Sequence, residues 1–330
     1  MKTPGFTPRR YTQGVMGGIG VITNPLSRQN QRHPERLRQL SELLGESGVL
    51  AQPKGLVALD EVALRFRAQA IDVLCINGGD GTLHRVLTAM KHAYGDTPLP
   101  RIAVLPSGTM NIIANSIGIR GSASSILRQV MRAQHSREAL QTTPRSLLKV
   151  AVEGHRDHYG FLFGNGIIAG FLEAYYEGGT PTPAKAAAVL GRGIFSVFVD
   201  GPYVQRLLKP FHGELTLDGN TWPAQPWTAV AVGTVEQIGL GFQPFRLVTS
   251  QPGHMHVVGI GGSVTDLARE LPRIYRGRPL QRPHNRETAC RELVIDGDQD
   301  QTYMIDGDFH RGNRRVTLTA LDTIDFILTR

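Results

Sequence analysis

The feature that most constrains this chain is a Gly-Gly-Asp-Gly-Thr string at residues 78–82, placed between an apolar run and a helical pattern. The apolar run over residues 71–76 predicts a buried strand, and apolar residues recur at helical spacing from Leu83 to Met90. Glycine permits positive φ and lets the backbone approach a ligand closely. The start of a helix supplies unpaired N–H groups and the positive end of its dipole. We therefore expect a phosphate site at the end of this strand.

The carboxylate of Asp80 lies inside that loop, where it would repel a phosphate group if phosphate were the only guest. Its presence therefore indicates a magnesium contact or a base beside the phosphates. The alternative is a plain tight turn in which Asp80 caps the helix that follows.

Two further loops follow predicted strands in the same half of the chain. Residues 105–111 follow a strand that ends at Leu105, and residues 23–27 follow the first strand. Thr109 and Asn111 either cap the next helix or face the same crevice as the glycine string. Because ligands bind beyond the carboxyl ends of parallel strands, we expect the three loops to share one crevice.

The patterns on either side of about residue 145 differ. In the first half, short apolar runs alternate with helical patterns, which indicates a parallel sheet covered on both faces. In the second half, short β-rich segments are separated by Gly, Pro or Asp turns, which is typical of an antiparallel β domain. A helical insert is expected over residues 183–208. We predict a flexible leader (1–14), an α/β domain (15–145) and a β-rich domain (146–330).

Composition restricts the class of protein. The 330 residues are 41% hydrophobic and 19% charged, which excludes global disorder. We find no charge-free apolar run of about 18 residues, no signal peptide and only two cysteines, and so expect a cytoplasmic protein without a disulfide framework. The net charge of +8 favours anionic partners. Zinc-finger and RNA-binding signatures are absent, so nucleic acid is not an expected partner.

Taken together, the motifs resemble the diacylglycerol kinase catalytic family, which includes sphingosine kinases and bacterial lipid kinases. The motifs that carry the resemblance are Asn24-Pro25-x-Ser27, residues 78–83, Pro106-x-Gly108-Thr109-x-Asn111, Gly239-x-Gly241-Phe242-x-Pro244 and Asp306-Gly307-Asp308.

This resemblance implies an enzyme that uses ATP and Mg²⁺ and transfers the γ-phosphoryl group to the hydroxyl of a diacylglycerol-like or sphingoid-like lipid. It implies that the α/β domain (15–145) binds ATP, that the β-rich domain (146–330) binds the substrate, and that the active site lies in the cleft between the two domains. It implies a cytoplasmic protein that meets its lipid peripherally at the membrane surface. In the family, an Asp-Gly-Glu string supplies the catalytic base. The candidate catalytic residues here are Asp308, Asp306 and Asp80. The residues implied for the nucleotide are Asn24, Pro25, Ser27, Gly78, Gly79, Asp80, Gly81, Thr82, Leu83, His84, Gly108, Thr109 and Asn111.

The chain departs from the family pattern at several positions. Asp308 is one methylene shorter than the family's Glu, and His84-Arg85 replaces the usual Asn-Glu. Pro252-Gly253 stands where bacterial members have an Asp-Gly pair that helps to hold a structural magnesium, so we expect that metal site to be lost or rebuilt.

Two other functions remain open. The glycine string also occurs in NAD kinases, so a kinase for a soluble substrate is the first alternative. A nucleotide-binding or lipid-binding protein without turnover is the second. A homodimer is also left open.

Two groups of side chains have both a functional and a structural interpretation. His254 and His256 alternate in a predicted strand and would share one face of it. They either bind a metal as a pair or, as we favour, are two exposed or core histidines without a metal. A set of aromatic residues either lines a slot for acyl chains or packs in the core, which is the default. These residues are Phe161, Phe163, Phe171, Tyr175, Tyr176, Phe195 and Phe198.

Overall fold

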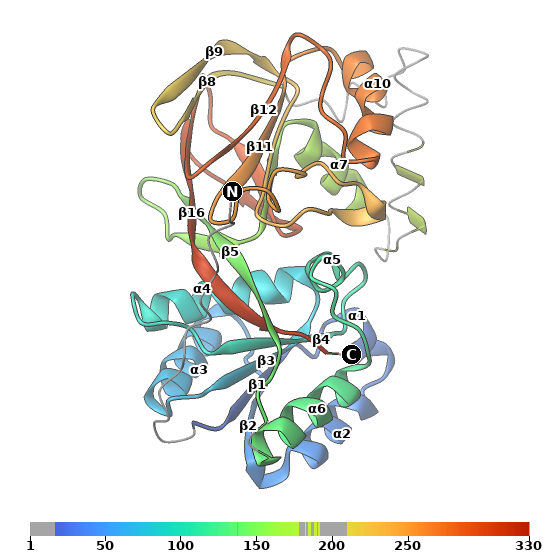
Figure 1. Ribbon diagram of the computed structural model, residues 1–330, viewed down its shortest axis with the longest axis vertical. Coiled ribbons are helices and arrows are strands. Elements are labelled where there is room, and N and C mark those ends of the chain that lie inside the picture. Colours follow the sequence, from blue (N-terminus) through green and yellow to red (C-terminus); the bar gives the residue numbers. More distant parts are fainter. Residues whose placement is uncertain are drawn as a thin grey trace, which may run out of the picture.

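The computed structural model describes residues 17–136, 138–177 and 210–329, with residues 182, 184, 185, 188, 189 and 191 between them (Figure 1). The leader predicted over 1–14 and most of the insert predicted over 183–208, with Phe195 and Phe198, lie outside the described residues. Within the described ranges, every helix is too short or too polar to cross a membrane.

The first part of the chain folds around a parallel sheet with the strand order β2-β1-β3-β4. Its strands are β1 (Ile19–Thr23), β2 (Gly48–Ala51), β3 (Val73–Gly78) and β4 (Arg101–Pro106). All residues of β1 and β3 are buried because helices cover both faces of the sheet. The sequence predicts three of these strands but not β2, which is short and contains Gly48.

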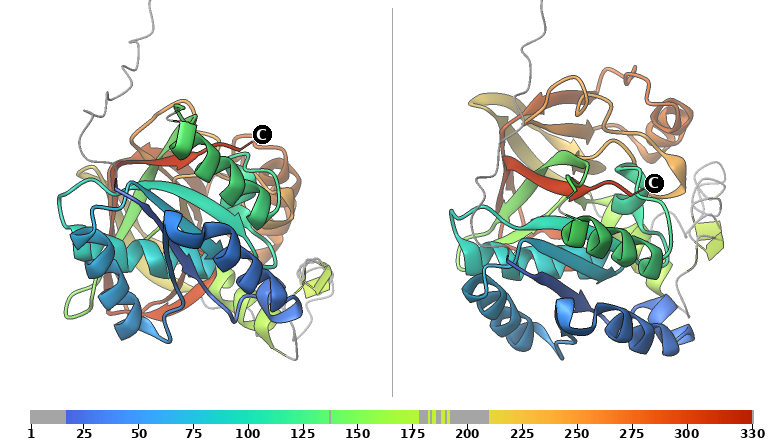
Figure 2. Two further views of the ribbon diagram at one scale, coloured as in Figure 1. Left: turned by 90° about the horizontal axis from the view of Figure 1, so that it is seen from below. Right: turned by 60° about the horizontal axis from the view of Figure 1, so that its bottom comes forward.

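Two pairs of helices cover the opposite faces of this sheet (Figure 2). The pair α3 (Leu56–Ala68) and α4 (Asp80–Tyr94) packs on one face, and the pair α2 (Glu35–Leu44) and α6 (Ala123–Ser136) packs on the other. Three short elements complete this part: α1 (Arg28–Arg32), α5 (Ile112–Ser116) and the 3₁₀ turn η1 (Gly45–Ser47). Helices α1, α4 and α5 all follow carboxyl ends of the parallel strands, which places their first turns at one edge of the sheet.

The second part is built mainly from antiparallel strands. One sheet has the order β12-β11-β10-β7-β14-β15. Its strands are β7 (Leu162–Asn165), β10 (Ala229–Gly233), β11 (Met255–Ile260), β12 (Asn285–Cys290), β14 (Thr302–Ile305) and β15 (Asp308–Arg311). Helices α7 (Ile167–Tyr176) and α10 (Val264–Tyr275) and the turn η2 (Gly239–Gly241) flank it (Figure 1).

The remaining strands extend the first sheet rather than forming a third one. They are β5 (Thr142–Ala151), β6 (His158–Gly160), β8 (Phe211–Leu217), β9 (Asn220–Trp227), β13 (Glu292–Gly297) and β16 (Arg315–Ile327). A core that includes Trp227, Leu293 and Val316 fills the space between these strands and the second sheet. The predicted fold class, an α/β part followed by an antiparallel β-rich part, is confirmed.

The long strand β16 joins the two parts. It pairs with β13 and, near its end, lies parallel to β4, with Phe326 opposite Ile102. Its register with β5 shifts between Ala320 and Thr323, which is the kind of irregularity that bends a strand. The sequence predicts only a short strand over 316–319 here. The structure instead carries the chain's last strand back into the first sheet, and the predicted domain boundary at 145 and 146 falls inside β5.

Candidate active site

The three loops identified in the sequence meet at the carboxyl edge of the parallel sheet, as predicted. The first loop covers residues 23–27, the second residues 78–82 and the third residues 105–111. Asn24 Nδ2 donates to Thr82 Oγ1 at 2.9 Å, which ties the first loop to the start of α4. The hydroxyl oxygens of Ser27 and Ser107 lie 3.0 Å apart, which ties the first loop to the third. The amide of Ser107 donates to the carbonyl of Gly78 at 3.0 Å. Hydrogen bonds therefore join the three loops to one another.

Glycine is required in these loops because two backbones touch, and not because of an unusual φ. Gly79 has φ −99, and Gly78, Gly81 and Gly108 also lie outside the left-handed region. The expectation that the string uses positive φ is therefore wrong. A Cβ added to Gly108 would lie 2.4 Å from the Cα of Gly79, closer than any side-chain atom fits. The loops after β3 and β4 thus approach each other backbone to backbone.

Helix α4 begins at Asp80, directly behind the contact between the two glycines. The amides of its first turn have no partners within the helix and point out of its N-terminus, a ready site for an anion. Asn111 adopts a left-handed conformation with φ 48, and its Oδ1 accepts from the amide of Gly108 at 3.0 Å. Asn111 thus shapes the third loop from within, while Thr109 beside it lines the cavity.

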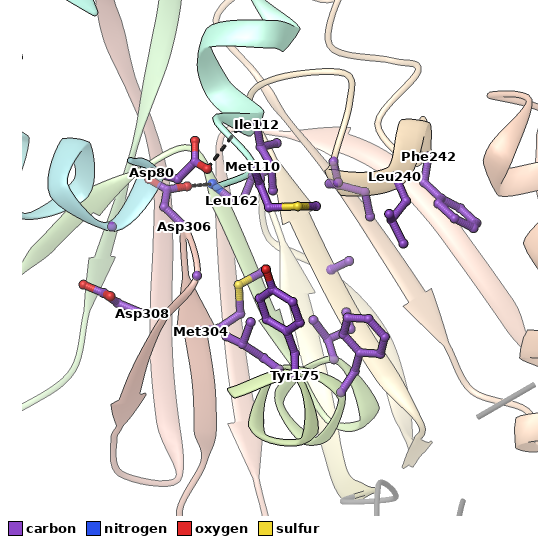
Figure 3. A pocket seen from close by; sticks show the side chains of 18 of the residues that line it. Asp80, Met110, Ile112, Leu162, Tyr175, Leu240, Phe242, Met304, Asp306 and Asp308 are labelled. Atoms are coloured by element: carbon purple, nitrogen blue, oxygen red, sulfur yellow. Dashed lines mark hydrogen bonds between the residues drawn. The ribbon is translucent and has the colours of Figure 1, made fainter. Parts of the chain in front are cut away.

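Asp80 begins helix α4, but its side chain caps helix α5. Its two carboxylate oxygens accept the amides of Ile112 (Figure 3) and Ile113, each at 3.0 Å, at the start of α5. Burial raises the pKa of Asp80, and the two donated hydrogen bonds oppose that rise. The carboxylate therefore joins the second and third loops, a structural contact that the sequence does not reveal.

His84 and Leu83, two of the residues implied for the nucleotide, do not line the cavity. Leu83 is buried in the hydrophobic core, and His84 is 1% exposed with its Nδ1 at 2.8 Å from the carbonyl of Tyr159. The turn of α4 points both side chains away from the loops. The implied contact of His84 with the nucleotide is therefore not supported by its position.

The Asp306-Gly307-Asp308 string forms the hairpin turn between β14 and β15. Asp306 and Gly307 have φ values of 47 and 89, the left-handed pair that tight Asp-Gly hairpins use. The Asp306 carboxylate is buried and accepts the amides of Phe161 at 3.1 Å and Leu162 at 2.8 Å. Burial raises the pKa of Asp306 well above its ordinary value. Asp306 thereby anchors the turn to β7 and fixes the place of Asp308.

Asp308 lies directly over the glycine string. A Cβ added to Gly81 would sit 2.8 Å from Asp308 Oδ1, so this carboxylate rests on the first turn of α4. Arg85 Nε, one turn farther along α4, donates to Asp308 Oδ2 at 2.6 Å. Arg85 appears in the sequence as a departure from the family pattern, and the structure identifies it as the partner of the candidate base.

A cavity of about 550 Å³ extends from these loops into the second part of the molecule. Of the residues predicted to bind the nucleotide or catalyse, it is lined by Asn24, Ser27, Gly79, Asp80, Gly81, Thr82, Gly108, Thr109, Asp306 and Asp308. Pro25, Gly78, Leu83, His84 and Asn111 lie outside the lining.

The far end of the cavity is apolar. Figure 3 shows Asp80, Asp306 and Asp308 on one side and Met110, Tyr175, Leu240, Phe242 and Met304 across from them. Phe171 and Tyr175 line the cavity, as one interpretation of the sequence predicts, and Tyr176 lines it beside Asp308, where its hydroxyl donates to the carbonyl of Gly307 at 3.4 Å. Phe161 and Phe163 do not line it: they are buried on either side of Leu162, against Phe326 and Tyr303 respectively.

Comparison with known proteins agrees with the motifs. Residues 18–142 match the family described as the diacylglycerol kinase catalytic domain. A protein named "Probable lipid kinase YegS" from Escherichia coli O127:H6 is 26% identical over 185 residues, which cover 55% of each chain. Sphingosine kinase B of Dictyostelium discoideum is 26% identical over 116 residues, which are 33% of this chain and 15% of that protein. The matches thus span less than two thirds of these relatives.

Two solved structures share the fold. A diacylglycerol kinase from Bacillus anthracis superposes with a TM-score of 0.64 at 14% identity, covering 96% of this chain and 98% of that one. Yeast NADH kinase superposes with a TM-score of 0.52 at 9% identity, covering 96% and 85%. At such identities the likeness concerns the fold alone. The resemblance to the diacylglycerol kinase catalytic family is confirmed by the match over residues 18–142.

Proposed function

Because residues 18–142 match the diacylglycerol kinase catalytic domain, we propose that this protein is an ATP-dependent lipid kinase that phosphorylates the hydroxyl of a diacylglycerol-like or sphingoid-like lipid. One observation carries the proposal: a single cavity connects the glycine loops and Asp308 with an apolar chamber. The loops suit the phosphates of a nucleotide, and the chamber suits hydrocarbon.

The nucleotide end is suited to a triphosphate. Phosphoryl transfer depends mainly on positioning and on neutralising charge. The amides at the start of α4 and the close pair Gly79 and Gly108 offer backbone donors without side chains in the way. The carboxylate of Asp308 is a hard oxygen ligand that would fit Mg²⁺, whereas both oxygens of Asp80 already accept amides of α5. When bound, Mg²⁺ would neutralise charge on the phosphates.

The acceptor end owes its volume to small residues on one face of β10. Ala229 and Ala231 face the cavity, whereas Val230 and Val232 face the core between the two sheets, as the alternation of a strand requires. Helix α10 contributes Leu267 and Leu271 from the other side. A chamber of this composition favours an acyl or sphingoid chain over the charged substrate of an NAD kinase, the first alternative.

Asp308 is the base in this proposal, and Asp306 positions it. Asp306 has both oxygens engaged with the amides of Phe161 and Leu162, whereas Asp308 lies beside the glycine string. Asp308 would accept the proton of the lipid hydroxyl as the oxygen attacks the γ-phosphorus. The lipid would enter from a membrane surface on which the protein docks peripherally.

The test is transfer of label from γ-labelled ATP with Mg²⁺ in mixed micelles that contain diacylglycerol, a sphingoid base or ceramide, with NAD assayed in parallel. The proposal expects label in an organic-extractable lipid. Labelled NADP would instead support the soluble-substrate alternative. Nucleotide binding without any labelled acceptor would support a protein that binds but does not turn over.

A further inference from the structure

Three histidines from three separate elements converge behind the glycine loop. His84 lies in α4, His158 in β6 and His310 in β15. One ring nitrogen from each lies within 4.8 Å of the other two. The ring centroids of His158 and His310 are 4.2 Å apart, and that of His84 lies 5.6 Å and 5.3 Å from them. Among the described residues this is the group of side chains whose spacing suits a metal ion.

The hydrogen bonds leave one nitrogen of each ring available. His84 Nδ1 lies 2.8 Å from the carbonyl of Tyr159, which requires the proton on Nδ1 and leaves the Nε2 lone pair free to ligate. Metal-binding histidines commonly donate their second nitrogen to a carbonyl in this way. His158 Nδ1 and His310 Nε2 are buried without any hydrogen-bond partner. Buried polar atoms without partners are uncommon and call for an explanation.

Neighbouring contacts restrict His84 and His310. Thr88, one turn after His84 on α4, accepts a hydrogen bond from the amide of Tyr159 at 3.1 Å. Together with the bond from His84 to the carbonyl of Tyr159, this joins α4 to β6 by two hydrogen bonds. The ring of His310 stacks on that of Tyr303 at 5.6 Å. These contacts restrict the two imidazoles before any ligand arrives.

The surroundings also keep the imidazoles neutral. Burial, reinforced by the neighbouring histidines, lowers the pKa of His158 to about 4 and that of His310 to about 3. Burial likewise lowers the pKa of His84. Neutral imidazole is the form that binds a metal.

We propose that His84, His158 and His310 form a binding site for zinc or a similar borderline divalent cation, which ties α4 to β6 and β15. Three imidazoles favour Zn²⁺, Co²⁺, Ni²⁺ or Cu²⁺ and disfavour Mg²⁺, which prefers oxygen. Tetrahedral Zn²⁺ with bonds of about 2.0–2.1 Å brings ligand nitrogens to about 3.4 Å from one another. The ring nitrogens, which lie within 4.8 Å of one another, must close on the cation to reach this spacing, and a water molecule would take the fourth position.

The site would couple metal occupancy to the candidate base. His310 is two residues from Asp308 on the short strand β15, so both side chains lie on the same face of that strand. A cation that draws His310 toward His84 would fix the strand that presents Asp308. The metal is distinct from the Mg²⁺ that accompanies ATP, because it binds behind the loop and through nitrogen.

The test uses the full chain, freed of any polyhistidine tag and stripped with a chelator, and titrated with Co²⁺ and Zn²⁺. We expect one equivalent of Co²⁺ to give visible d–d absorption that Zn²⁺ abolishes and Mg²⁺ does not, and we expect Zn²⁺ to raise the melting temperature. Single variants His158→Asn and His310→Asn should each weaken Zn²⁺ binding by more than the about 10–100-fold that outer-shell partners contribute. Both side chains are half-buried, so the folded state should tolerate these changes.

The matched control is His155→Asn, an exposed histidine three residues before His158. It should bind Co²⁺ and Zn²⁺ as the unaltered chain does. Absence of stoichiometric binding to the unaltered chain would overturn the proposal, as would equal binding by the His155 and His158 variants. Should a triad variant fail to fold, the cobalt spectrum and the Zn²⁺-induced rise in melting temperature of the unaltered chain decide the matter. None of these readouts requires kinase activity, so they are independent of the proposed function.

Discussion

Replacing Asp308 with Asn is expected to lower the rate of phosphoryl transfer by about 10²–10⁴-fold, the usual contribution of a positioned general base. The amide keeps the shape of the side chain but cannot accept the proton of the lipid hydroxyl. Because the start of α4 and the glycine loops are unchanged, the affinity for ATP measured without Mg²⁺ should stay close to that of the unaltered chain. Single-turnover rates and ATP titration separate the two quantities.

Two companion variants sharpen this test. Asp308→Glu restores the residue found in the family motif and should retain much of the activity. Asp300→Asn makes the same chemical change at an exposed turn and should behave as the unaltered chain. Full activity of the Asp308→Asn variant would remove Asp308 from the base role.

Replacing Gly108 with Ala is expected to damage nucleotide binding. Its Cβ would lie 2.4 Å from the Cα of Gly79, so the loops after β3 and β4 must separate. The contact with Gly79 is with the backbone, so no rotation of a side chain relieves it. A displacement of about 1 Å in such a site can cost about 10²-fold, and we expect a fall of that size in kcat/KM for ATP.

Gly18→Ala provides the control for this substitution. An added Cβ there meets no atom within 4 Å, and Gly18 is not in the left-handed region. That variant should keep both its stability and its affinity for ATP, as measured by thermal unfolding and nucleotide titration. Equal affinities for ATP in the Gly108 and Gly18 variants would show that the loops do not need their close contact.

Local patterns revealed the loops because their chemistry is local. A strand end, glycines and a helix start are contiguous in the sequence, so residues 78–82 alone predict a phosphate site, and the parallel sheet brings the other two loops alongside. The Asp306-Gly307 hairpin is equally local. In contrast, the loops need glycine because the backbones of Gly79 and Gly108, which are distant in the sequence, touch each other. The structure shows this close approach, and not a positive φ, as the reason for the glycines.

Features that depend on tertiary structure were not predictable from one sequence. His84 was assigned to the nucleotide from its place in the string, yet the turn of α4 carries it toward β6. In the sequence, the candidate metal pair is His254 and His256. The histidines that converge in the structure are His84, His158 and His310. The return of β16 to the first sheet had a weak signal in the apolar residues near its end, but register and partner are set by the whole fold.

The account rests on one cavity that serves both substrates, and filling its apolar end tests that claim directly. Ala231→Phe would place a ring in the chamber, with Ala224→Phe as control on the exposed strand β9. We predict that Ala231→Phe lowers kcat/KM for the lipid at least about 10-fold while the affinity for ATP is unchanged. Unaltered lipid phosphorylation by a folded Ala231→Phe variant would contradict the account.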